Sequence, residues 1–235
     1  MARTSTQLKL AMNWLLNFFS STIGRKVVMA LTGLFLILFL VVHLIGNLQL
    51  LKSDNGEAFN VYAQFMTSNP LIKVISYLNY AFILIHIIWS IILTRRNRSA
   101  RGPEGYAVTR NSSHWTSRNM GILGTFIFIF LVIHLRSFWY EMHWGGIPMA
   151  NYNGTDYKDL YTVVDTAYAS IGFVMLYVIS MALLAFHLFH GFGSAFQTLG
   201  LNHIKYNPMI RIVGVAFAIV VPALFALIPL YMYFN

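Results

Sequence analysis

The sequence predicts an all-α membrane protein with five transmembrane helices. Of its 235 residues, 57% are hydrophobic and only 10% are charged, whereas soluble domains carry about 45–50% apolar and about 25% charged residues. Five apolar stretches each contain the roughly 20 residues that a helix needs to cross a membrane. This composition argues against a soluble enzyme, a disordered chain and a nucleic-acid-binding module. The sequence has no cysteine, which excludes disulfides, thiolate metal sites and protein-bound iron–sulfur clusters.

Residues 1–24 form an N-terminal segment that precedes the membrane domain. Within it, Leu8–Phe19 (LKLAMNWLLNFF) is apolar but too short to cross a membrane. We expect an amphipathic helix at the membrane surface, with Trp14 and two phenylalanines among the lipid headgroups. Arg25 and Lys26 then directly precede a full-length span, a pattern that argues against a cleaved signal peptide.

Residues 25–235 contain the five expected spans. We expect the helix of the fourth span to begin early, near Tyr161. The fifth span contains Pro222 and Pro229, which we expect to kink it. The five spans are Val27–Leu51, Leu71–Leu93, Met120–Tyr140, Ala167–Phe192 and Ile210–Phe234.

The distribution of charge predicts the orientation in the membrane. If the N-terminus is inside, 12 of the 16 basic residues lie on the inner side and six of the seven acidic residues lie at the outer side or its edge. The positive-inside rule then places the N-terminus in the cytoplasm and the C-terminus outside. The densest positive charge lies between the second and third spans, in TRRNRSARGPEGYAVTR. This loop is either a topology signal in contact with anionic lipid or a docking surface for a cytoplasmic partner.

Histidines within the spans are the strongest indication of function, because ionisable residues are costly in lipid. Five of the eight histidines lie in spans, namely His43, His86, His134, His187 and His190. Because successive spans run in opposite directions, His43 and His134 lie near the outer end. His86 and either His187 or His190 lie near the inner end. At 1.5 Å per residue, the two layers are about 15 Å apart.

A short repeat supports the outer pair. The first span reads GLFLILFLVVHL from Gly33, and the third reads GTFIFIFLVIHL from Gly124. Two parallel helices with the same pattern present their histidines at the same depth. The two glycines would lie at the depth of the inner pair, where they either make room for a bulky planar group or let helices approach closely.

The pairing of the histidines indicates what they bind. Zinc requires four ligands at one point, whereas these histidines come in twos at two depths. A proton relay usually recruits carboxylates, and no acidic residue lies in the middle of a span. Haem fits better, because imidazoles from two helices can fill both axial positions of its iron. With both positions filled, electron transfer is the natural task.

These residues resemble the di-haem cytochrome b membrane-anchor subunits of succinate dehydrogenases and fumarate reductases, of the type with five spans in one chain. The resemblance covers about residues 20–200. In three spans it rests on GRKVVMALTGLFLILFLVVHLIGN, ILIHIIWSI and RNMGILGTFIFIFLVIHL. In the fourth, the family has a ligand histidine, a glycine four residues later and a Trp-Gly pair. His187, Gly191 and Leu199-Gly200 match that spacing, with leucine in place of tryptophan, and His190 does not match it.

The resemblance implies a cytochrome b domain with two haem b groups inside the first four spans. Its axial iron ligands would be His43 and His134 for the outer haem and His86 and His187 for the inner haem, with His190 as the alternative fourth ligand. It also implies an iron–sulfur subunit and a flavoprotein on the cytoplasmic face of a bacterial inner membrane, and a complex that can form a higher oligomer. The quinone, menaquinone or ubiquinone, would react near the outer haem. Succinate oxidation and fumarate reduction share this architecture.

Polar residues near the span ends are candidates for contact with these groups. A polar side chain at the outer end could bond a quinone oxygen, although loop polarity is the simpler explanation of such residues; the candidates are Asn47, Gln49 and Glu57. Basic side chains could pair with haem propionates, although the positive-inside rule also explains the inner ones. The candidates are Arg25, Lys26 and Arg118 for the inner haem and Arg136 for the outer haem.

Two alternatives stay open at this point. The first is the anchor of another quinone-linked di-haem complex, of the hydrogenase or formate dehydrogenase type, which its partner subunits would distinguish. The second is a haem-free transporter that uses histidines for proton or metal coupling. Such a transporter would be colourless, and we would expect carboxylates within its spans or helices broken near the midplane.

Overall fold

The computed structural model describes residues 13–14, 16–102 and 114–235. In these ranges, five helices are long and apolar enough to cross a membrane, as the sequence predicts. They correspond to α2 (Thr22–Asn47), α4 (Pro70–Arg101), α6 (Met120–His134) with its continuation, α9 (Ile171–Thr198) and α10 (Asn207–Phe234). The protein therefore has the architecture of a multi-pass membrane protein.

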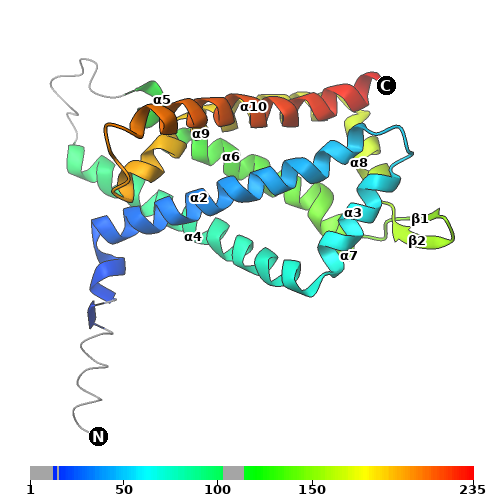
Figure 1. Ribbon diagram of the computed structural model, residues 1–235, viewed down its shortest axis with the longest axis horizontal. Coiled ribbons are helices and arrows are strands. Elements are labelled where there is room, and N and C mark those ends of the chain that lie inside the picture. Colours follow the sequence, from blue (N-terminus) through cyan, green and yellow to red (C-terminus); the bar gives the residue numbers. More distant parts are fainter. Residues whose placement is uncertain (1–12, 15, 103–113) are drawn as a thin grey trace, which may run out of the picture.

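The long helices lie side by side, and the chain reverses direction after each one (Figure 1). One end of the bundle carries the start of α2, α5 (Trp115–Arg118) and the turn between α9 and α10. Most basic residues of the described ranges lie there, so we name it the basic end. The opposite end carries the short elements of residues 48–69 and 140–170 together with the C-terminus. We name it the capped end.

Four of the helices enclose a common axis. α2 packs against α4 and α9, and α6 also packs against α4 and α9. The contacts therefore form a closed ring in which α2 lies diagonally opposite α6, and α4 lies diagonally opposite α9. α10 packs along the outside of α9 and also touches α2. Residues on diagonal helices can thus meet only at the axis of the bundle.

Large apolar side chains cover the outer surface of the spans. Leu38 is 67% exposed and Ile219 is 59% exposed, and many other apolar residues of the long helices have comparable exposure. A water-soluble monomer rarely exposes contiguous apolar surface on this scale. Such a surface suits the hydrocarbon interior of a membrane, where apolar side chains face lipid. The helical backbone is compatible with lipid too, because its hydrogen bonds are made within the helix.

The third and fourth spans differ from the predicted helices. α6 ends at His134, and a π-helical turn, η2 (Leu135–Trp139), leads into α7 (Tyr140–Trp144). The prediction of one helix from Tyr161 through the fourth span was wrong. The structure instead has α8 (Leu160–Tyr168), a break at Ser170 and then α9. Ser170 has extended backbone angles, so the chain turns there before it enters the span.

Other boundaries move by less. α2 begins at Thr22, because the Ser21 side chain accepts a hydrogen bond from the Gly24 N–H and caps the helix. A short 3-10 turn, η1 (Leu48–Leu51), follows α2. α10 is continuous through both of its prolines, which lie on its buried face. Of the predicted surface helix, residues 13–14 and 16–20 are helical, with Trp14 65% exposed; the other residues of Leu8–Phe19 lie outside the described ranges.

The capped end contains elements that the sequence analysis did not predict. One is the helix α3 (Glu57–Ser68), and the other is a hairpin of β1 (Met149–Tyr152) and β2 (Thr155–Lys158). The hairpin turn is Asn153-Gly154, and both residues have positive φ, 52° and 82°. Asn-Gly is the preferred pair for such two-residue turns, so YNGT was a readable hairpin signal.

Asn60 connects these elements. Its side chain is fully buried and donates hydrogen bonds to Tyr152 Oη (3.0 Å) and to Asp159 Oδ1 (2.9 Å). Its carbonyl oxygen accepts from the Tyr161 N–H (2.9 Å). One amide thus joins α3 to the hairpin and to the start of α8. The cap is therefore a folded unit rather than a set of loose loops.

Candidate bis-histidine sites

The outer histidine pair lies near the capped end. His43 on α2 and His134 at the end of α6 have ring centres 5.7 Å apart, with their planes at 90°. Because α2 and α6 are diagonal helices, the two rings meet at the axis of the bundle. Aromatic rings within 6.1 Å of these imidazoles enclose them; they belong to Phe39, Phe130, Phe138, Tyr177 and Phe225.

The inner pair occupies the other diagonal. His86 on α4 and His187 on α9 have ring centres 6.4 Å apart, with their planes at 64°. His187 Nδ1 is buried and has no hydrogen-bond partner. Leaving a buried polar atom without a hydrogen bond costs free energy, so the missing partner of this nitrogen needs an explanation.

The two pairs lie at different depths, as the sequence predicts. Thr32 and Gly33 on α2 are level with the inner pair, since Thr32 Oγ1 lies 3.1 Å from His86 Nδ1 and a Cβ on Gly33 would lie 3.4 Å from His86 Cε1. His43 is ten residues further along the same helix, which corresponds to about 15 Å. At Gly124 a Cβ would meet no atom within 4 Å, so close helix contact is not the reason for glycine there.

The structure distinguishes His187 from His190. The ring that faces His86 is that of His187. His190 is half-buried and lies about one turn further along α9 toward the basic end. The structure therefore favours His187 as the partner of His86, and the role of either residue as a ligand stays a prediction.

Hydroxyl and amide groups contact the histidine rings, and the sequence analysis missed the two hydroxyls and predicted a different contact for the amide of Asn47. Thr32 contacts His86 as above, and Tyr177 Oη on α9 lies 3.1 Å from His134 Nδ1. Asn47 Nδ2 lies 3.4 Å from both ring nitrogens of His43 and donates to the His43 carbonyl at 2.8 Å. No sequence pattern reveals Thr32 and Tyr177 as partners, since they lie on other helices than their histidines. Asn47 lies four residues after His43 on α2, a spacing that brings side chains of one helix together.

The basic candidates have different surroundings. Arg25 is only 8% exposed; its Cζ lies 5.3 Å from the ring centre of Trp89, and its Nη1 is buried without a partner. Lys26 and Arg118 are exposed. Arg136 is turned away from the bundle, because it forms an ion pair with Glu141. Of the four, Arg25 is the one that is buried with unused hydrogen-bonding capacity.

A hollow of about 580 Å³ lies at the capped end, between η1 and α3. It brings together two of the polar candidates for quinone binding, Gln49 and Glu57. Tyr62 lines the same hollow, and its hydroxyl donates to the Val42 carbonyl next to His43 (3.4 Å). Burial raises the pKa of Tyr62, so its hydroxyl stays protonated. Asn47, the third polar candidate, does not line this hollow; its side chain donates to the His43 carbonyl instead.

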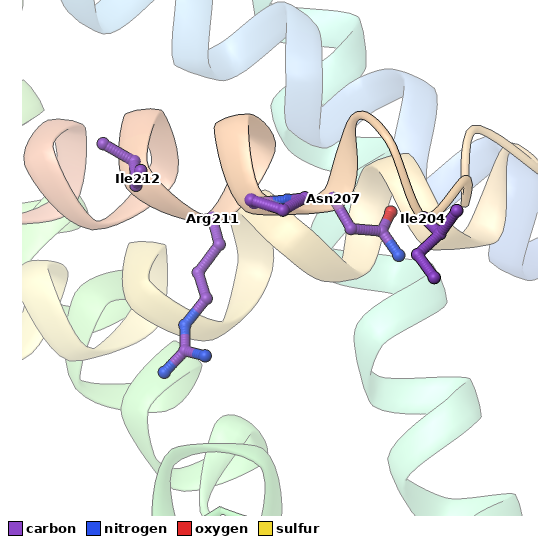
Figure 2. Close-up of a pocket in the computed structure, with 5 residues that line it drawn as sticks. Ile204, Asn207, Arg211 and Ile212 are labelled. Carbon is purple, nitrogen blue, oxygen red and sulfur yellow. The ribbon is translucent and has the colours of Figure 1, made fainter.

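A second hollow, of about 550 Å³, lies at the basic end. It is lined by the turn before α10 and by the first turns of that helix (Figure 2). Ile204 is 87% exposed there, and Arg211 extends from α10 away from Ile204. This hollow contains none of the residues that the sequence analysis selected.

The residues present fit a haem with two imidazole ligands. With metal–nitrogen bonds of about 2 Å, the length for zinc-bound imidazole, two rings on one metal have centres roughly 6 Å apart. Ring packing alone also gives such distances, so the stronger observation is the placement of the two pairs on the two diagonals of the bundle. In the described ranges no three His, Asp or Glu side chains come together. The donor set consists of imidazole pairs.

Comparisons of the chain with protein-family models, curated proteins and solved structures give no significant match.

Proposed function

We propose that the chain is the di-haem cytochrome b membrane-anchor subunit of a succinate:quinone oxidoreductase. The observation that carries the proposal is the arrangement of four histidines as two facing pairs, one on each diagonal of a four-helix bundle and at two depths. His43 and His134 would hold one haem b, and His86 and His187 the other. A haem with two imidazole ligands exchanges electrons and has no free position for oxygen.

The rest of the assembly follows the resemblance of the sequence. The basic end would face the cytoplasm of a bacterium, in agreement with the positive-inside rule, and the iron–sulfur and flavoprotein subunits would dock there. Succinate or fumarate would react on the flavoprotein. At the inner site, Arg25 is placed to pair with an anionic group, because its guanidinium is buried with Nη1 unpartnered.

Quinone would bind in the hollow between η1 and α3. Glu57 and Tyr62 supply a carboxyl and a protonated hydroxyl there, and Val61 and Phe65 supply apolar walls. Tyr62 also contacts α2 beside His43, so the hollow adjoins the outer histidine pair. Quinone reduction takes up protons, and a carboxyl at the site can deliver them.

The haem content of the purified protein tests the proposal. We expect two b haems per chain in a pyridine haemochrome assay, and one per chain in His187→Ala, because this variant removes one of two axial ligands. His190→Ala, the matched control from the same helix, should keep both. Loss of a haem only in His190→Ala would move the fourth ligand by about one turn. A colourless protein, expressed with haem and with its partners, would refute the cytochrome proposal.

Partner subunits co-purified in mild detergent separate the succinate-linked complex from other di-haem anchors. We expect a flavoprotein and an iron–sulfur protein with succinate:quinone activity. Recovery of a hydrogenase or formate dehydrogenase instead would leave the haem sites standing and refute the assignment of the complex.

For the quinone site we expect Glu57→Gln to lower quinone reduction by roughly 100-fold with both haems retained, since positioned acids and bases contribute about 10²–10⁴-fold. Glu57 also accepts a hydrogen bond from Asn153 Nδ2 (3.3 Å). Asn153→Gly removes that bond, keeps the carboxyl and tolerates the positive φ of the turn, so it is the control for a purely structural role. Equal losses in both variants would contradict the proposed site.

A further inference from the structure

We propose that Thr32 and Tyr177 are positioning residues that fix the protonation and orientation of His86 and His134, one at each site. The inference rests on the proposed function, because it assigns the nitrogen that each of these histidines offers to iron. We call Thr32 and Tyr177 the two hydroxyl partners. Metal-bound histidines usually donate their second ring N–H to a neighbouring acceptor, which sets the tautomer and raises the basicity of the ligand.

The hydrogen bonds of Thr32 determine the tautomer of His86. The Thr32 hydroxyl has one proton and donates it to the carbonyl of Val28 (2.8 Å), with that of Met29 also near (3.2 Å). Toward His86 Nδ1, at 3.1 Å, Thr32 Oγ1 can therefore only accept. Nδ1 must carry the hydrogen, and this leaves the Nε2 lone pair of His86 free to bind a metal.

Tyr177 is the corresponding hydroxyl at His134. Its side chain is 5% exposed, and its hydroxyl lies 3.1 Å from His134 Nδ1. A tyrosine hydroxyl can accept as well as donate, so when His134 binds metal through Nε2, its Nδ1–H donates to Tyr177 Oη. Rings on both sides of Tyr177 hold it in place, those of Phe130 at 4.9 Å and Phe173 at 4.9 Å.

The two hydroxyl partners are distributed reciprocally over the bundle. α2 supplies His43 to the outer pair and Thr32 to the inner pair, whereas α9 supplies His187 to the inner pair and Tyr177 to the outer pair. α4 and α6 supply one histidine each. The two histidines and the hydroxyl partner of each site thus come from three helices, and α2 and α9 contribute to both sites.

In the described part of the chain, the other histidine of each pair has no comparable acceptor. His187 Nδ1 is buried without a partner. The amide nitrogen of Asn47, which lies near His43, is a donor and cannot accept an N–H. Each pair therefore combines one histidine held by a hydroxyl with one that is not, and the hydroxyl should influence its own site alone.

Redox titration of the purified protein tests this inference. Thr32→Val removes the hydroxyl and keeps the shape, Tyr177→Phe does the same at the outer site, and Thr32→Ser restores a hydroxyl. A more basic imidazole favours ferric over ferrous iron, so loss of the N–H acceptor should raise the midpoint potential. A tenfold loss of this preference corresponds to about 59 mV for one electron. His187→Ala, which removes the inner haem, identifies which titration wave is which.

We expect Thr32→Val to raise the potential of the inner haem alone and Tyr177→Phe that of the outer haem alone, with Thr32→Ser close to the parent protein. Loss of the inner haem in Thr32→Val with retention in Thr32→Ser would also support the role of the hydroxyl. Unchanged potentials, equal shifts of both haems, or loss in both Thr32 variants would overturn the inference. In each of these cases two haems in the parent protein would leave the proposed function intact.

Discussion

Replacement of His134 by alanine is expected to halve the haem content, from two haems per chain to one. In the proposed function, His134 supplies one of the two imidazoles at the outer site, and the inner pair is about 15 Å away along the bundle. Loss of the outer haem therefore should not disturb the inner one. The measurement is the haem count together with the redox titration, in which one wave should vanish and the other should keep its potential.

Double variants test this prediction more strictly, because the effects of two substitutions within one site do not add, whereas those in independent sites do. His43→Ala combined with His134→Ala should lose no more haem than either single variant, since both belong to one site. His134→Ala combined with His187→Ala should lose both haems. His143→Ala is the matched control, because His143 is exposed at the capped end and should keep two. Loss of both haems in the double variant of the outer site would contradict the independence of the sites.

The second large effect is expected on stability, from Asn60→Ala. This change leaves the Tyr161 N–H without its acceptor and removes donors from Tyr152 and Asp159. Asn60 is fully buried and its three partners are half-buried. An unsatisfied buried group costs about 1–3 kcal/mol, so we expect the free energy of unfolding of the cap to fall by about 1–3 kcal/mol. Burial tends to raise the pKa of Asp159, but hydrogen bonds from Thr162 and Asn60 outweigh it and lower the pKa. Loss of Asn60 weakens that effect.

Limited proteolysis and thermal unfolding in detergent measure this loss. Protease cleavage in the hairpin between α7 and α8 should be faster in Asn60→Ala than in the parent protein, while the haem content of the inner site stays unchanged. The control is Asn151→Ala, since Asn151 is exposed on the hairpin and its side chain bonds only to nearby residues of the same turn. If the two variants were equally resistant, the cap would not depend on the buried amide.

The sequence predicted the five spans and the two histidine layers for physical reasons. Span length is set by the thickness of the bilayer, and alternating span direction converts positions such as those of His43 and His86 into depths. The choice of which helices face each other diagonally depends on packing, and the pattern of a single helix contains no information about its neighbours. Thr32 and Tyr177 were missed for this reason, and so was Phe225, which α10 places 5.6 Å from His43.

The capped end was less predictable. The apolar composition drew attention to the spans, and the early start expected for the fourth span merged α8 with α9. Ser170 separates the two helices because its backbone is extended. A serine side chain does not require this conformation, so the break could not be predicted from the residue type. The hairpin could have been predicted, because Asn153-Gly154 is a strong turn signal. Asn60 could not, because its partners lie about a hundred residues further along the chain.

Helix α2 contributes a residue to each of the two histidine sites, and this restricts how the sequence of the protein can change during evolution. Thr32 and His43 serve different sites from one rigid helix, eleven positions apart, or about three turns. Exposed residues between them, such as Leu38 and Val41, can be exchanged for others of similar size without effect on either site. Gly33 and Phe39 cannot, because they lie against His86 and His43. A single insertion or deletion would rotate one of the two by about 100° relative to the other. We therefore expect relatives of this chain to vary at the exposed positions of residues 33–42 and to keep the number of residues there constant.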